Sequence, residues 1–164
     1  MFSLQKLMGK DDKFFRLLEA SAEESHHSVQ GLAALLKTRA EKRSLDAFID
    51  ARRKDKQITL ELTEHLMKTF VTPLDREDIE ALSTALYKIP KTVEKFCERL
   101  LAAGNTVQDE DFSKQAAMLE KATETVVSLV KELRHGVHLD RVKTQNDQLQ
   151  AIEGEADKLM LDLL

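Results

Sequence analysis

Residues 68–79 read Lys-Thr-Phe-Val-Thr-Pro-Leu-Asp-Arg-Glu-Asp-Ile and separate two long segments with helical patterns. Pro73 ends the preceding helix and suits the first position of the next, because its fixed φ fits a helix start. Thr72 is a favourable N-cap residue, and Asp75 would lie near the positive end of the second helix. The stretch therefore predicts two helices joined by a short turn, with the second helix beginning at Pro73.

On both sides of this turn, apolar residues recur at steps of three and four residues, which is typical of amphipathic helices. We expect helices over about residues 11–37, 44–70, 73–103 and 110–133, and a last one from about residue 139. Pro90 should kink the third helix, Gly104 and Asn105 should end it, and Gly136 should end the fourth. Short connections make neighbouring helices antiparallel, so the expected fold class is all-α, a long up-down helical bundle.

Composition restricts the function classes. The chain has 164 residues, enough for one domain, and a formal net charge of -4, which argues against a generic nucleic-acid binder. Its single cysteine, Cys97, excludes an internal disulfide and fits a cytoplasmic setting. No apolar run approaches the roughly 20 residues of a membrane span. We therefore expect a cytoplasmic protein, and contact with the inner face of the membrane stays open.

The stretch at residues 68–79 also resembles the "TF(I/V)TP(F/L)DREDI" segment of the PhoU-like accessory proteins of Pit-type inorganic-phosphate transporters. This resemblance implies two three-helix bundles related by duplication. The first would cover about residues 11–103 and the second about residues 109–164, where only two of three helices fit. It also implies a regulatory role beside a phosphate transporter, as a protein without enzymatic activity.

The PhoU-like family carries acidic metal-binding motifs, and the sequence keeps one of them. Glu153 and Asp157, at i and i+4 in the last helix, resemble the family's E(D)xxxD motif and could bind iron or a divalent metal weakly. No other cofactor is expected. Taken without the resemblance, such a pair is common on charged helices. A metal-binding bundle and a generic helical assembly module remain alternative functions.

Elsewhere, basic or neutral residues replace the acids that the resemblance implies. Arg52 and Lys56 occupy one motif, while Tyr87, Lys88 and Lys91 occupy another. Nearby Lys or Arg opposes cation binding, so a basic patch for an anion or an acidic partner is the sharper hypothesis, and a solvated face the plainer one. The proposed patch consists of Arg52, Arg53, Lys54, Lys56, Lys88 and Lys91.

A ferritin-like di-iron site is a rival hypothesis, because Glu-x-x-His occurs three times in the sequence. The residues concerned are Glu23, Glu24, His26, His27, Glu132 and His135. The helical pattern places them off the apolar stripes, so surface positions are favoured. Cys97 is expected to be a structural thiol rather than a nucleophile, because no oriented base accompanies it.

An incomplete second bundle would leave an apolar surface uncovered, and such surfaces mark interfaces. We therefore expect a homo- or hetero-oligomer or a complex with the transporter. The predicted contacts are Val126, Val130, Ile152, Leu159 and Leu163.

Overall fold

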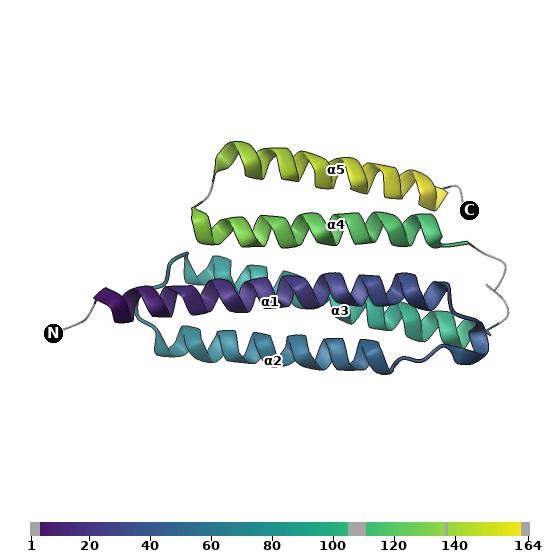
Figure 1. Cartoon of the computed structure of the whole chain (residues 1–164), viewed down its shortest axis with the longest axis horizontal. Coiled ribbons are helices and arrows are strands. Elements are labelled where there is room, and N and C mark those ends of the chain that lie inside the picture. The colour runs from purple at the N-terminus through teal and green to yellow at the C-terminus, as the bar shows by residue number, and fades with distance from the viewer. Residues whose placement is uncertain (1–3, 105–110, 137, 162–164) are drawn as a thin grey trace.

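The computed structural model describes residues 4–104, 111–136 and 138–161, with side chains for all of these except residues 4–11, 40 and 160. In this part of the chain there are five α-helices and no strand, which confirms the all-α prediction. They are α1 (Leu4–Leu36), α2 (Asp46–Lys68), α3 (Arg76–Ala103), α4 (Ser113–Glu132) and α5 (Leu139–Leu161), with 3-10 turns at Ala40–Lys42 and Leu133–His135. The helices run alternately up and down, as Figure 1 shows.

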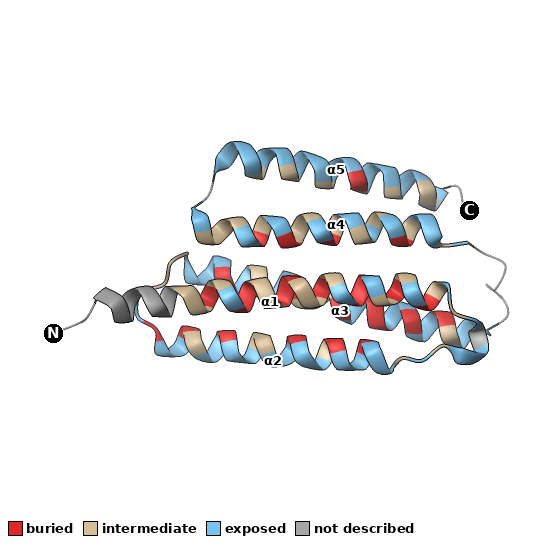
Figure 2. Cartoon of the chain, viewed as in Figure 1, coloured by how far each residue is buried: buried red, intermediate tan, exposed pale blue. Residues whose placement is uncertain are grey.

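Helix α1 is the centre of the molecule. It contacts α2, α3 and α4, and for that reason it is buried along more than the single stripe that the sequence indicates. Figure 2 shows buried residues along most of α1, whereas α5 is mostly exposed. Leu17, Ser21 and Ser28 are buried in addition to the stripe residues Leu18 and Val29.

The buried residues form two apolar clusters, one toward each end of the bundle. The first includes Phe14, Leu18 and Leu66, and the second includes Val29, Phe48 and Cys97. Several polar residues that belong to neither cluster are also buried. Those contributed by α1, α2 and α3 are Ser21, Ser25, Ser28, Asp55, Ser83 and Glu94.

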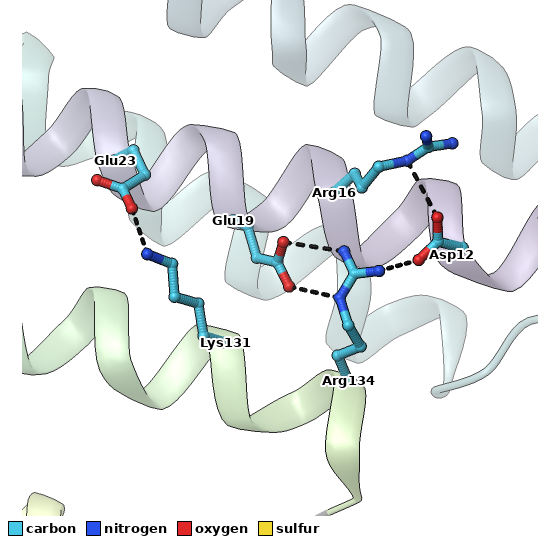
Figure 3. A network of polar contacts seen from close by, with 6 residues as sticks. All are labelled: Asp12, Arg16, Glu19, Glu23, Lys131 and Arg134. Atoms are coloured by element: carbon cyan, nitrogen blue, oxygen red, sulfur yellow. Dashed lines mark hydrogen bonds and ion pairs between the residues drawn. The ribbon is translucent and has the colours of Figure 1, made fainter.

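Helix α4 belongs to the same core as α1–α3. Val127 and Val130 are members of the first cluster, so a division near residue 109 does not separate two cores. Ion pairs add to this contact (Figure 3). Arg134 donates to both carboxylate oxygens of Glu19 at 2.9 Å and also to Asp12, while Lys131 lies 2.6 Å from Glu23.

Helix α5 packs on α4 through one narrow stripe. The buried and half-buried residues of that stripe are Val142, Gln145, Leu149, Ile152, Ala156 and Leu159. The rest of the described helix surface is exposed and largely polar. The contact with α4 therefore covers the apolar stripe of α5, including Ile152.

The packing of α4 and α5 buries some of the predicted interface residues within the chain. Val130 and Ile152 are buried within the chain, and Val126 packs against the first cluster. Leu159 is half-buried on the α5 stripe, and Leu163 lies outside the described residues. Two of the five predicted contacts, Val130 and Ile152, are thus covered by the chain's own helices.

Candidate docking site

The turn between α2 and α3 differs from the sequence-based expectation. Helix α3 begins at Arg76, with Asp75 at the N-cap position, so the prediction that Pro73 starts it was wrong. Thr72 is not the N-cap either, because residues 72–75 precede the helix and Asp75 takes that position. Thr72 Oγ1 instead donates to the carbonyl oxygen of Leu74 at 2.7 Å, which stabilises the segment before the helix.

Arg76 fixes the end of α2 to the start of α3. Its Nη1 donates to the carbonyl oxygen of Thr69 at 2.7 Å, and its Nη2 donates to that of Leu66 at 2.6 Å. Carbonyls at a helix C-terminus lack intrahelical donors and carry partial negative charge, so a guanidinium is a well-matched partner. The turn is therefore held by backbone and side-chain bonds of the 68–79 stretch itself.

Three apolar side chains are exposed here, one in the last turn of α2 and two in the turn that follows it. Met67 is 72% exposed, Phe70 104% and Val71 62%. We call these three residues the apolar tip. Single exposed apolar residues are common, but three within five positions of the chain are more than scattered exposure, and groups of exposed apolar residues often mark contact sites. The sequence pattern predicted the turn and missed this exposure, although Phe-Val directly before Thr-Pro was a visible signal.

The six residues of the predicted basic patch do not share one surface. Lys54 Nζ lies 3.9 Å from Glu24 of α1, whereas Arg52 Nη1 lies 2.7 Å from Glu94 of α3, so they leave α2 on different sides. Arg53 lies 3.0 Å from Asp50 on α2 itself. The reason is that three consecutive residues point about 100° apart around a helix. The prediction of one patch containing all six was therefore wrong.

A smaller basic group remains at the contact of α2 and α3. Lys56 follows Arg52 by one helical turn, and both Lys88 and Lys91 are exposed on α3. Arg52 already has partners within the chain, because it bonds to the nearly fully buried carboxylate of Glu94 and to Tyr87. These bonds raise the pKa of Arg52. Its first role is to neutralise Glu94. Binding of an anion by this group stays a prediction.

The residual acidic pair lies on the exposed outer side of α5. Glu153 and Asp157 are both exposed, and they make no ion pair among the described residues. No group of three or more His, Cys, Asp or Glu side chains that could hold a metal ion occurs in the part of the chain that the structure describes. Two exposed carboxylates supply too few ligands for a tight site without further donors.

The di-iron rival has no support in this geometry. Glu23, His26, Glu132 and His135 do border one open groove of about 480 Å³ between α1 and α4. Their nearest partners are other protein groups, however. His26 Nδ1 lies 2.9 Å from Thr123 Oγ1, and the Glu23 carboxylate is bound to Lys131, whose hydrogen bond lowers the pKa of Glu23.

A buried carboxyl group lies at the contact of α1 and α2. Asp55 is fully buried, and its Oδ1 accepts a hydrogen bond from Ser21 Oγ at 2.6 Å. Its Oδ2 has no hydrogen-bond partner among the described residues, and neither has the buried Ser83 Oγ. Burial raises the pKa of Asp55 to about 6, opposed by the Ser21 bond and reinforced by Glu24. Asp55 follows Ala51 by four residues and precedes Leu62 by seven, so it lies on the same stripe of α2. This spacing was the signal in the sequence that Asp55 is buried.

Cys97 is fully buried in the second cluster, and burial raises the pKa of its thiol to about 12. A thiol with such a pKa is protonated at neutral pH and unreactive, which agrees with the structural role expected from sequence.

Comparison with known proteins leaves the family resemblance without independent support: the chain matches no protein-family model, and no curated protein is significantly similar to it. Among the described residues, none of the helices combines the length and apolar character needed to cross a membrane.

Proposed function

We propose that this protein is a non-enzymatic accessory or regulatory protein of inorganic-phosphate transport, which acts in the cytoplasm by contact with a Pit-type transporter. The observation that carries the proposal is that some residues of the 68–79 stretch hold the turn while others are exposed to solvent. Thr72 and Arg76 hold the turn through backbone carbonyls, while Phe70 and Val71 face solvent.

A fully exposed phenyl ring on a well-held turn contributes nothing to the core of this chain. Aromatic side chains that anchor protein interfaces have this arrangement, because a rigid support lowers the entropy lost on binding. The same stretch carries the resemblance to transporter accessory proteins. A contact between the apolar tip and the transporter accounts for both facts.

Site-specific cross-linking tests this proposal. Because Cys97 is buried, a cysteine introduced as Phe70→Cys would be the reactive thiol toward a maleimide photo-cross-linker. The matched control is Leu161→Cys, at a side chain 70% exposed on the end of α5, opposite the α2–α3 turn (Figure 1). We expect adducts with a co-expressed Pit-type transporter from the Phe70 position and far fewer from the control position.

Phosphate uptake provides the second readout. Deleting the gene should change uptake through the transporter, and a Leu161→Ser copy should restore the original rate whereas a Phe70→Ser copy should not. Equal restoration by both copies, or equal cross-linking from both positions, would contradict the proposal.

A further inference from the structure

The apolar tip is followed in sequence by four acidic residues at the start of α3. Asp75, Glu77, Asp78 and Glu80 are all exposed, and none of them forms an ion pair within the described part of the chain. We call these four residues the acidic rim. Four carboxylates within six positions give this end of α3 a local negative charge next to the apolar tip.

The two basic residues closest to the rim in sequence are bound to other groups. Lys68 lies 3.4 Å from Glu64 on its own helix, and Arg76 directs its guanidinium at the carbonyls of Leu66 and Thr69. Among the described residues, the surface at this turn therefore combines exposed apolar side chains with carboxylates that form no ion pair.

Helix stability accounts for only part of the rim. Glu77 and Asp78 lie in the first turn of α3, where negative charge is favourable. Asp75 makes no side-chain capping bond, however, and Glu80 lies beyond the first turn, where the dipole effect has largely decayed. The combination of charge and exposed apolar surface calls for a complementary partner.

An anionic membrane surface is a poor match, because the negative potential of the cytoplasmic leaflet repels carboxylates. A protein segment with Lys or Arg beside apolar side chains is a good match, since opposite charges across an interface steer association and set its register. Cytoplasmic loops of membrane proteins carry an excess of Lys and Arg.

We propose that the apolar tip and the acidic rim together bind a Lys/Arg-rich, partly apolar cytoplasmic segment of a membrane protein. This inference rests on the proposed function and specifies the chemistry of the partner: Phe70 and its neighbours contact the apolar side chains of the segment, and the rim carboxylates pair with its basic side chains.

The test uses the full chain and fluorescent peptides that correspond to the cytoplasmic loops of the Pit-type transporter. The rim variant carries Asp75→Asn, Glu77→Gln, Asp78→Asn and Glu80→Gln. Its matched control carries the same kinds of change on exposed positions of α4 and α5: Asp140→Asn, Asp147→Asn, Glu124→Gln and Glu155→Gln. Both variants raise the net charge equally, so only the position of the charge differs.

We expect one basic loop peptide to bind, with affinity about tenfold lower for the rim variant and within about twofold of the original for the control. Raising the salt concentration from about 50 to about 300 mM should weaken binding to the original protein and have much less effect on the rim variant. Phe70→Ser should weaken binding irrespective of salt.

The two proposals fail differently. If Phe70 cross-links to the transporter but peptide binding ignores both salt and the rim changes, the inferred basic partner is wrong while the proposed function stands. If the original protein binds anionic phospholipid vesicles in a Phe70-dependent manner and no loop peptide, a lipid surface is the occupant and the inference is overturned. If position 70 yields no transporter adduct, the proposed function itself fails.

Discussion

Ser25 Oγ donates to the carbonyl oxygen of Leu86 at 3.2 Å across the contact of α1 and α3. Pro90 follows Leu86 by four residues and has no backbone N–H, so this carbonyl lacks the donor that a regular helix would supply. The hydroxyl of α1 takes the place of that amide, and its single hydrogen is shared between this carbonyl and the carbonyl of Ser21, which lies 3.0 Å away. The proline thus stays inside α3 because a neighbouring helix satisfies the group that it leaves free.

The first prediction concerns this compensation. Ser25→Ala should lower the free energy of unfolding by about 1–2 kcal/mol, since a buried carbonyl loses its partner. In a Pro90→Ala background the restored amide can bond to Leu86, so the same change should cost about half as much or less. Chemical denaturation of the four proteins of this double-mutant cycle measures the difference. An equal cost in both backgrounds would refute the compensation.

The second prediction concerns Asp55 and pH. Its pKa is raised from 3.8 to about 6 in the folded protein, so the folded state binds more protons between these values. The free energy of unfolding should therefore fall as pH rises from about 4 to about 6, by about 3 kcal/mol, because one pKa unit corresponds to about 1.36 kcal/mol. Asp55→Asn mimics the neutral form and should remove this contribution.

The measurement is the stability difference between Asp55→Asn and the original protein across pH 4 to 7.5. It should be small near pH 4 and increase in favour of the variant up to about pH 6, then stay level. Asp147→Asn, at an exposed site on α5, is the control for loss of one surface carboxylate. A pH-independent difference for Asp55→Asn would show that the carboxyl group is ionised at no cost.

The sequence pattern predicted where the helices lie in the chain better than which helices pack against one another. Steps of three and four residues identified all five helices, because burial of one helical face imposes that period locally. These steps could not show that α1 contacts three helices, because Leu17 and Ser21 are buried by residues distant in the chain. The spacing of about 100° between consecutive helical residues already separates Arg52 from Lys54. What the pattern could not show is which helix each of them faces, α3 for Arg52 and α1 for Lys54.

The candidate site shows the same limit. The stretch at residues 68–79 was identified as a turn from its own residues, because Thr-Pro and the acids that follow are local signals. The start of α3 at Arg76 was missed, since residues 72–74 are not helical and Asp75 takes the N-cap position. The exposure of Phe70 was missed because it depends on whether another element covers the turn, and Phe-Val directly before Thr-Pro was the only local signal.

The third prediction distinguishes the structural role of Arg52 from the predicted binding role of its neighbours. Arg52→Gln would leave the carboxylate of Glu94, only 6% exposed, without its charged partner. We expect a loss of about 2 kcal/mol in the free energy of unfolding, because an uncompensated buried charge is costly. Lys56→Gln and Lys91→Gln, both at exposed positions, should change stability by less than about 0.5 kcal/mol. Equal effects from all three would contradict the assignment.

The fourth prediction concerns the attachment of α4. Arg134→Gln removes the paired bonds to Glu19 and the contact with Asp12 that Figure 3 shows, so the C-terminal end of α4 should separate from α1 more often. Amide hydrogen exchange in α4 and α5 should accelerate by about tenfold while that of α2 and α3 changes little. Arg141→Gln, which removes an exposed pair with Glu132, is the control. Uniform acceleration throughout the bundle would mean that α4 does not open independently.

The last prediction concerns Arg76, which we expect to be essential for the shape of the α2–α3 turn. Arg76→Ala removes two hydrogen bonds from carbonyls of Leu66 and Thr69 and should cost about 1–3 kcal/mol, as bonds to charged groups usually do. Arg76→Lys keeps the positive charge near the C-terminus of α2, but an ammonium cannot reproduce the planar, paired geometry, so it should restore only part of the loss. Cross-linking from Phe70→Cys should decline in parallel with stability of the turn, because the apolar tip then loses its fixed direction. A Lys68→Ala variant, which removes only an exposed pair with Glu64, should leave both readouts nearly unchanged. If Arg76→Ala unfolds as readily as expected yet keeps full cross-linking, the tip binds its partner without a preformed turn, and rigidity is not what the 68–79 stretch contributes.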